Sequence, residues 1–471
     1  MISAPVSGPR APSPRTILAN ASAILTGLSG SAARASGDIA IADGRISAIG
    51  AVARRPDDRV VDVSGSVIYP GLVSTHHHLN QSVLKAIPGG LDAALPEWLV
   101  RVPYTFWNHI DADAFTRSVE LGMVELLLSG VTTIADHHYI FDAALDYDPA
   151  AILFDVAGRL GVRFLLARGG ATLNSRMAAD GLKRVPAESV ETILDRVAAL
   201  AARFHDPAPD ARRRVALAPT NLVWSVTPEH MAELAAGGRA LGLRLHSHLS
   251  EGAGDVTACL ERYGQRPVEM VAAHGFTGPD VWLAHLIHID DRERAILTES
   301  GTTLAHCPQS NARLGAGIAA APAFAAAGGR VSLGVDGAAS NEAADMINEM
   351  HAAWLLHRAI GGPDALPVEE VVRWASANGA DALGFAETGR LEPGRLADIA
   401  VFDVSGPRHA GVHDLAVAPV VCGGGTRVRH LFVGGEAVVS DGRVVGSDLP
   451  AVLAGVAESV ARLKAQTGAR G

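Results

Sequence analysis

Between residues 70 and 385 the sequence alternates short apolar runs with amphipathic stretches, and this alternation constrains the fold more than any other feature. The apolar runs predict eight strands, which begin near Val67, Val131, Val162, Val215, Leu243, Val281, Thr303 and Val331. The spacing of apolar residues between them predicts helices over 114–128, 190–204, 228–241, 292–299 and 343–356. Eight strand–helix units in about 300 residues are typical of a (β/α)8 TIM-type barrel.

A doubly wound open sheet is the competing interpretation of the same alternation. That fold carries a G-x-G-x-x-G turn after its first strand, and no such turn is found here. We therefore expect an α/β protein in which residues 70–388 form the barrel.

Both ends of the chain have a different pattern of predicted secondary structure from the middle. Residues 16–69 and 389–471 contain short strand-like runs separated by Asp-Gly and Gly-Gly turns, such as those at 43–44 and 434–435. We expect these two segments to form one small β-sandwich, with a terminal helix at the C-terminal end. Residues 1–15, rich in Pro, Ser and Ala, are expected to be a disordered tail.

Composition excludes several classes of protein. The 471-residue chain has a net charge of −10 and no basic stripe, which argues against nucleic acid as its partner. No run of 18 or more apolar residues occurs, so we expect no membrane span. The three cysteines lie far apart and form no C-x-x-C clip, and the N-terminal segment has no apolar core of the signal-peptide type. These features favour a cytoplasmic protein.

Histidines cluster where the first predicted strand ends. The segment PGLVSTHHH at 70–78 places His76 and His78 two residues apart, so on a strand both imidazoles project from one face. Two neutral imidazoles suit a divalent metal such as zinc. H-x-H alone is a weak motif, because most such pairs are exposed or hydrogen-bonded histidines. Its position at a strand end, where barrel active sites lie, strengthens it.

The fifth predicted strand supplies a third imidazole. HSHLSE at 246–251 contributes His248 and, three residues later, the carboxylate of Glu251, which can shuttle protons. We expect His246 to support a metal ligand, the alternative being that it binds the metal itself.

Two further strand ends complete the candidate site. His285 follows an apolar strand and can polarise the attacked bond or hold the nucleophile, whereas we expect His288 to be structural. Asp336 ends the eighth strand, where a carboxylate can ligate metal and accept a proton from water. Its alternative role is to cap the helix that follows.

With these motifs the chain resembles the amidohydrolase superfamily, specifically its mononuclear aminohydrolase branch of guanine-deaminase-like enzymes. The resemblance rests on PGLVSTHHH at 70–78, HSHLSE at 246–251, LAHLIH at 283–288, HCPQSN at 306–311 and GVDGAASNE at 334–342. It implies metal ligation by His76, His78, His248 and Asp336, proton transfer by Glu251, and a catalytic role for His285. It also implies one divalent metal, because no bridging lysine follows the strand that ends at 168–170. Zinc is expected, with iron and manganese as alternatives.

Within this branch the sequence is similar to pterin aminohydrolases, through stretches such as LLARGGAT at 165–172 and AHCPQSNARL at 305–314. This likeness implies hydrolytic deamination of isoxanthopterin to the corresponding lumazine and ammonia. Asp336 would take a proton from the attacking water, His285 would orient it, and Glu251 would protonate the ring nitrogen. Deamination of 8-oxoguanine or another purine or pyrimidine, triazine amino- or chlorohydrolysis, and a non-catalytic scaffold are the alternatives.

The residues expected to contact the substrate are indicated by the sequence less specifically than the metal ligands are. Gln81 can hydrogen-bond a ring carbonyl or nitrogen of the substrate, the alternative being a position on a helix surface. Arg168 can pair with an oxo group of the substrate, the alternative being a salt bridge that holds two loops. Trp98 and Trp224 can stack on a planar ring, although core or lid packing is the expected use of both. Residues 98–107 and the loop after Arg168 are candidates for a mobile lid. The resemblance implies a homodimer.

Overall fold

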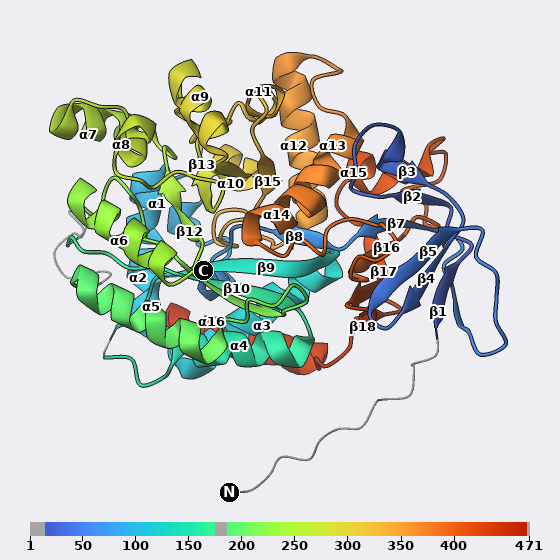
Figure 1. The fold of residues 1–471 in the computed structure, drawn as a ribbon. Coiled ribbons are helices and arrows are strands. Elements are labelled where there is room, and N and C mark those ends of the chain that lie inside the picture. The colour runs from blue at the N-terminus through green and yellow to red at the C-terminus, as the bar shows by residue number, and fades with distance from the viewer. Residues whose placement is uncertain (1–14, 143, 175–185, 469–471) are drawn as a thin grey trace, which may run out of the picture.

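The computed structural model describes residues 15–142, 144–174 and 186–468. Its centre is a barrel of eight parallel strands, ringed by helices (Figure 1). The strands are β8 (Leu72–Ser74), β9 (Val131–His138), β10 (Arg163–Arg168), β11 (Arg213–Leu217), β12 (Leu245–Leu249), β13 (Val281–His285), β14 (Thr303–His306) and β15 (Val331–Leu333). The ring closes where the Thr75 backbone N–H donates to the Leu333 carbonyl oxygen at 3.0 Å. The predicted TIM-type barrel is confirmed.

One predicted barrel strand is wrong in its position. The apolar run near Val67 forms β7 (Ser66–Pro70), which pairs with β16 (Ile399–Asp403) in another sheet, and the barrel strand β8 begins only at Leu72. Gly71 separates the two, and a Cβ there would lie 2.3 Å from the Thr132 hydroxyl of β9. The chain therefore passes from one sheet to the next within two residues, and an apolar run alone does not reveal this break.

The helices that cover the barrel start at local capping signals. Asp111, Asp148 and Ser189 accept the first free N–H groups of α3, α4 and α5. The helices are α1 (Leu95–Arg101), α2 (Pro103–Phe106), α3 (Ala112–Leu128), α4 (Pro149–Leu160), α5 (Val190–Phe204), α6 (Pro228–Ala240), α7 (Ala253–Tyr263), α8 (Pro267–Ala273), α9 (Asp291–Ser300), α10 (Pro308–Arg313), α11 (Ala321–Ala326), α12 (Met346–Gly361), α13 (Val368–Arg373), α14 (Gly379–Leu383), α15 (Ala418–Cys422) and α16 (Leu449–Thr467).

Strands from both ends of the chain form two further sheets beside the barrel (Figure 1). One has the order β5-β4-β1-β6 and the other β19-β18-β17-β16-β7-β2-β3. Their strands are β1 (Thr16–Ala19), β2 (Ala23–Leu25), β3 (Arg34–Ala35), β4 (Asp38–Ala42), β5 (Arg45–Gly50), β6 (Arg59–Asp62), β17 (Arg427–Val433), β18 (Glu436–Ser440) and β19 (Arg443–Val444). Residues such as Leu18, Ile39, Ile68 and Ile399 fill the core between them. The terminal helix α16 packs on α3 of the barrel.

A buried ion pair joins barrel strand β10 to the second sheet. Both side chains are at most 1% exposed, and the Arg163 guanidinium donates to the Asp398 carboxylate at 2.8 and 3.0 Å. Asp398 directly precedes β16, and it also accepts the Gly434 backbone N–H at 2.8 Å.

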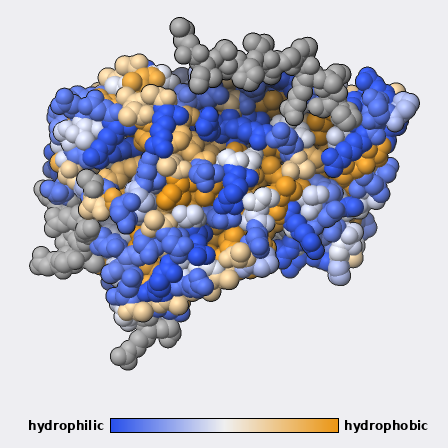
Figure 2. Space-filling view, turned by 90° about the horizontal axis from the view of Figure 1, so that it is seen from below, coloured by the Kyte–Doolittle hydropathy of each residue, from blue (hydrophilic) through white to orange (hydrophobic). Residues whose placement is uncertain are grey.

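The remaining global features agree with the composition. The face in Figure 2 mixes hydrophilic and hydrophobic residues without one dominant apolar region. Within the part of the chain that the structure describes, no helix is long and apolar enough to cross a membrane. The tail expected over 1–15 lies outside the described residues except for Arg15, which pairs with Asp58 at 2.8 Å.

Candidate active site

A cavity of about 310 Å³ opens at the carboxyl ends of the barrel strands, where active sites of this fold lie. Lining residues come from most of the strand ends and from α1 and α2. They are His78, Gln81, Leu95, Trp98, Leu99, Tyr104, Tyr139, Ala171, Leu173, Asn174, Thr220, Asn221, Trp224, Ser225, His248, Glu251, Arg262, Tyr263, His285, Leu314 and Asp336. Six of the eight predicted site residues therefore line the cavity, Gln81 among them. His76 is not in the lining but lies directly against these residues.

His246 fixes the tautomer of His76. The Nδ1–H of His246 donates to the Trp282 carbonyl oxygen at 2.8 Å, because that oxygen can only accept. Nε2 of His246 is then an acceptor, and it lies 2.9 Å from Nδ1 of His76, which must donate. Burial lowers the pKa of both rings well below the usual range, so both are neutral. Nε2 of His76 is left as a bare lone pair.

His78 and His248 present bare nitrogens for the same reason. Nδ1 of His78 donates to the His137 carbonyl oxygen at 2.8 Å, and Nδ1 of His248 donates to that of Thr220 at 2.5 Å. Burial lowers the pKa of His78 to about 3 and also lowers that of His248, so neither ring carries a second proton. Their Nε2 atoms lie 3.1 Å apart. Two lone pairs at this distance repel each other unless a cation lies between them.

Asp336 adds a carboxylate to the three bare nitrogens. Its Oδ1 lies 3.4 Å from Nε2 of His76 and 3.4 Å from Nε2 of His78. Oδ2 accepts the Ser310 hydroxyl at 2.6 Å and Oδ1 accepts the Gly337 backbone N–H at 2.7 Å, which favours the ionised form. Three imidazole lone pairs and one carboxylate therefore converge without a proton among them. This donor set fits a divalent metal, and nitrogen and oxygen ligands of this kind suit zinc.

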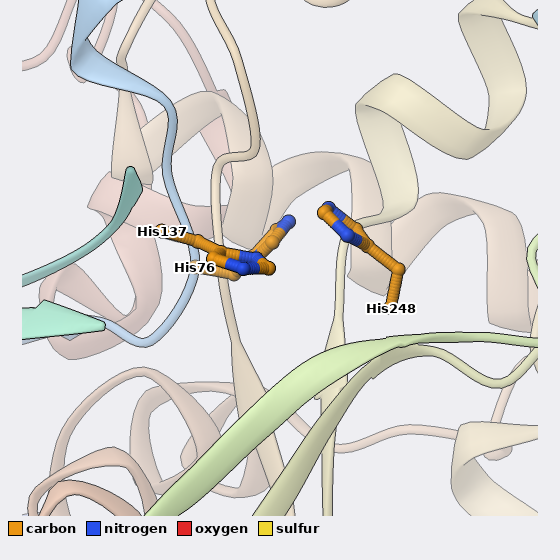
Figure 3. Close-up of side chains that lie close together, drawn as sticks. All are labelled: His76, His137 and His248. Atoms are coloured by element: carbon orange, nitrogen blue, oxygen red, sulfur yellow. The ribbon is translucent and has the colours of Figure 1, made fainter. Parts of the chain in front are cut away.

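Figure 3 shows His137 beside His76 and His248, and one nitrogen from each lies within 4.8 Å of the others. Nε2 of His137 lies 3.0 Å from the Ala218 carbonyl oxygen, so it carries the proton and cannot ligate a metal. The His137 ring instead stacks on His248, with centroids 4.8 Å apart. We therefore interpret His137 as a residue that packs against the proposed metal ligands and does not bind the metal.

Glu251 and His285 lie next to each other in the lining of the cavity. Nδ1 of His285 donates to Oδ1 of Asn311 at 2.9 Å, and its bare Nε2 lies 3.7 Å from Oε2 of Glu251. Burial raises the pKa of Glu251 to about 8, and the negative charge of Asp336 adds to the shift. Glu251 is thus protonated near neutral pH, and beside it His285 offers an acceptor.

The backbone is strained at the same strand ends. Ser250, His285, Leu286 and Asp336 all adopt left-handed conformations, with φ of 53°, 76°, 47° and 62°. Each such residue costs about 1–3 kcal/mol and persists where the surrounding structure holds it. Here the strained residues end or follow β12, β13 and β15, next to the converging side chains.

Gln81 is buried and lines the cavity from the 3-10 helix η2 (Leu79–Gln81). A Cβ on Gly337 would lie 2.0 Å from its Oε1, so a larger residue at 337 would force the Gln81 side chain to move. The alternative position on an exposed helix surface does not occur.

Arg168 is buried but does not line the cavity. Its Nη2 donates to both carboxylate oxygens of Glu188 at 2.8 Å, and its guanidinium lies over the Phe141 ring at 4.8 Å. The salt bridge, which was the alternative role, is the one that the geometry shows.

Both candidate stacking residues line the cavity. Trp98, on α1, donates its indole N–H to the Ala339 carbonyl oxygen at 3.2 Å, and Trp224 donates its own to Asp255 at 2.7 Å. The expected lid segment of α1 and α2 also contributes Leu95, Leu99 and Tyr104 to the lining. The other expected lid, the loop after Arg168, lies partly outside the described residues, at 175–185.

Three polar residues of this site have roles that the sequence did not predict. Asn311 orients His285, Ser310 bonds Asp336, and Tyr139 lines the cavity, where it interacts with Gln81. The signal was present for Ser310 and Asn311, which follow β14 within the motif HCPQSN, at a strand end like the other site residues.

A barrel with donors that converge in this way is typical of metal-dependent hydrolases. Residues 67–438 match the family model described as "Amidohydrolase family". The chain is 45% identical to an isoxanthopterin deaminase from an unknown prokaryotic organism, over 95% of this chain and 97% of that protein. It is 37% identical to 8-oxoguanine deaminase of Pseudomonas aeruginosa, over 89% and 93%.

Among solved structures, atrazine chlorohydrolase TrzN from Arthrobacter aurescens TC1 complexed with zinc matches with a TM-score of 0.87, at 28% identity, over 94% of this chain and 100% of that one. The chain belongs to the amidohydrolase family, as its motifs predicted. It is an enzyme that hydrolyses carbon–nitrogen bonds other than peptide bonds.

Proposed function

We propose that this enzyme is a metal-dependent deaminase of an aromatic bicyclic heterocycle, and that isoxanthopterin is its substrate. The observation that carries the reaction is the convergence of three bare imidazole nitrogens and Asp336 beside Glu251 and His285. The substrate rests on the 45% identity to isoxanthopterin deaminase over almost the whole chain.

The proposed metal ligands are His76, His78, His248 and Asp336, with zinc as the proposed ion. A divalent cation bound there supplies Lewis acidity that makes water nucleophilic near neutral pH. Its identity as zinc is supported by the donor set and by the zinc in the atrazine chlorohydrolase structure.

The protein groups then move protons. Asp336 takes a proton from the attacking water, and bare Nε2 of His285 accepts a hydrogen bond that orients it. Glu251 protonates the ring nitrogen next to the amino-bearing carbon, so that electrons can move onto the ring. The water oxygen bonds to the amino-bearing carbon, which becomes tetrahedral. The amino group then takes the proton held by Asp336 and leaves as ammonia as the carbon–nitrogen bond breaks. The new hydroxyl returns its proton to Glu251 and becomes the carbonyl of the lumazine.

Substrate contacts follow from the cavity lining. We propose that Gln81 bonds a ring carbonyl or nitrogen, because its Oε1 is buried at the cavity with no partner among the described residues. Trp98 and Trp224 offer flat apolar surfaces to a planar ring. Arg168 is not proposed as a contact, because it is paired with Glu188 away from the cavity.

Ammonia release from isoxanthopterin, pterin, 8-oxoguanine, guanine and isocytosine tests the proposal, with metal content measured on the same sample. Isoxanthopterin is expected to turn over fastest, with about one metal per chain. The variant Glu251→Gln is expected to keep the metal and to lose about 10²- to 10⁴-fold in kcat, because it removes the proton donor.

Turnover of 8-oxoguanine alone would keep the mechanism and reject the substrate. Ammonia from none of the five with one metal bound would reject deamination of this class and favour a triazine-type leaving group, such as chloride. A folded protein that binds no metal would reject the proposal as a whole.

We also propose a cytoplasmic homodimer. Cys259, Cys307 and Cys422 are free thiols, which supports a reducing compartment. The homodimer rests on the family resemblance alone.

A further inference from the structure

Asp255 is a buried carboxylate that takes none of the roles proposed above. It lies in the first turn of α7, one turn after Glu251, and is 5% exposed. In the described part of the chain it forms no ion pair, and its partners are N–H groups.

Those N–H groups come from two functional parts of the cavity. Oδ1 accepts the indole N–H of Trp224 at 2.7 Å, and Oδ2 accepts the backbone N–H of Glu251 at 3.3 Å. One side chain therefore connects a wall of the cavity to the residue proposed as the proton donor.

The position of Asp255 in the helix does not by itself require a carboxylate. Asp255 is the third residue of α7, whose N-cap is Gly252. An uncharged side chain such as glutamine can also accept a backbone N–H from this position, and burying a carboxylate without a cation is costly. An ionised carboxylate, however, accepts through both oxygens, whereas asparagine would turn an NH₂ group toward one of the N–H donors. The arrangement needs two acceptors on opposite sides, and only a carboxylate of this length supplies them.

Both connected groups are held from their other sides as well. The Arg262 guanidinium lies 4.4 Å from the centroid of the Trp224 ring, and Arg262 donates to the Val223 carbonyl oxygen at 3.2 Å. The carbonyl oxygen of left-handed Ser250 accepts N–H groups from Ile287 at 2.9 Å and His288 at 3.1 Å. These contacts hold Trp224 and the backbone next to Glu251 in place independently of Asp255.

We propose that Asp255 is a positioning residue for the deamination. Through its two oxygens it sets the distance between the Trp224 ring, against which the heterocycle lies, and the Glu251 carboxyl, which protonates that heterocycle. This inference rests on the proposed function. A shift of about 1 Å in such a pair costs about 100-fold in rate.

Steady-state kinetics on Asp255→Asn, Trp224→Phe and the double variant test this role, with Asp148→Asn as the matched control. Asp148 is an exposed cap of α4, so its substitution keeps kcat and KM. Asp255→Asn is expected to lower kcat about 10- to 100-fold with metal content unchanged. In the Trp224→Phe background the same change is expected to cost less than 3-fold, because the asparagine NH₂ no longer faces an indole N–H.

A second measurement does not depend on any substrate. In protein labelled with ¹⁵N-tryptophan, the Trp224 indole N–H is expected to resonate downfield, as charge-assisted hydrogen bonds do, and to be identified by its absence in Trp224→Phe. Asp255→Asn is expected to shift that resonance and leave the other five in place. If Asp255→Asn does not fold, Trp224→Phe alone decides: the inference predicts a lower kcat as well as a higher KM.

Wild-type kcat and KM in folded Asp255→Asn would overturn the inference, as would equal losses in the presence and absence of the indole. An unshifted Trp224 resonance in Asp255→Asn would overturn the hydrogen bond itself. Failure of the wild type to deaminate any substrate, with the expected resonance shift present, would instead reject the proposed function and leave the geometric link intact.

Discussion

At the residue scale, the position of one proton decides whether an imidazole can ligate a metal. His76, His78 and His248 each donate Nδ1–H to a fixed acceptor, which leaves Nε2 bare. For two of them the acceptor is a backbone carbonyl, but for His76 it is another histidine, His246. The tautomer of His76 therefore depends on a side chain that sequence reasoning could describe only as supporting.

Replacing His246 tests this dependence. His246→Ala is expected to weaken metal binding about 10- to 100-fold, because loss of an outer hydrogen-bond partner frees the ligand ring. His246→Gln is expected to retain most of the affinity, since its amide can accept from His76 and donate to the Trp282 carbonyl oxygen. Equilibrium competition with a chelator measures the affinity directly, without reference to turnover.

The control for this series is His274→Ala. Nδ1 of His274 bonds the Met270 carbonyl oxygen of its own helix turn, remote from the cavity lining. Equal affinities for the alanine variants at 246 and 274 would show that His246 has no influence on the metal site.

At the element scale, much of the fold could be predicted because periodicity is a local property. The helix predicted over 190–204 matches α5 residue for residue, and seven of the eight barrel strands lie where apolar runs begin. The exception lies near Val67, because the apolar run there forms two consecutive strands, β7 and β8, that belong to different sheets. Which sheet a strand joins depends on β16, more than 300 residues away, and no local pattern records that pairing.

Site residues were predictable to a different degree. The predicted site residues lie at the carboxyl ends of strands or just after them, and a parallel barrel brings all strand ends together. They are His76, His78, His248, Glu251, His285 and Asp336. Arg168 also lies at a strand end, yet its charge is paired with Glu188. The partner lies in an irregular segment, so sequence position alone could not distinguish a cavity contact from an ion pair.

Glu349 is a buried glutamate between α10 and α12, and its titration makes the free energy of unfolding depend on pH. Glu349, in the first turn of α12, accepts the Gln309 backbone N–H at 3.0 Å, and burial raises its pKa to about 8. Its unfolded pKa is about 4.3, so between these values the folded state binds one more proton than the unfolded state. The contribution of Glu349 is thus fully present below pH 4 and is lost as the pH rises to 8.

The variant Glu349→Gln removes this titration. Relative to the wild type, its free energy of unfolding is expected to rise by about 1.4 kcal/mol for each pH unit between 5 and 8. Urea unfolding of both proteins at saturating metal measures the difference. A difference that stays constant over this range would mean that Glu349 is already ionised in the folded protein.

At the scale of the whole molecule, the chain enters the barrel from the end sheets at Gly71, and an ion pair at Arg163 links the barrel to the second of those sheets. The guanidinium of Arg163 donates to Asp398 and also to the carbonyl oxygens of Asp210 and Ala211. Asp398 in turn holds the turn after β17 through Gly434. A single ion pair thus fixes β10, the start of β16 and a turn of the second sheet relative to one another.

Breaking this pair should destabilise the molecule much more than breaking an exposed one. Asp398→Asn leaves the buried Arg163 charge without its counter-ion, and its expected cost is about 3–5 kcal/mol in the free energy of unfolding. The double variant Arg163→Met, Asp398→Asn is expected to be more stable than Asp398→Asn, because it buries no unpaired charge. Asp148→Asn, which removes the exposed pair with Arg203, is expected to cost less than about 1 kcal/mol. Urea unfolding of the three variants decides: a double variant no more stable than Asp398→Asn would show that hydrogen bonds to the carbonyl oxygens, and not the buried charge, hold this junction.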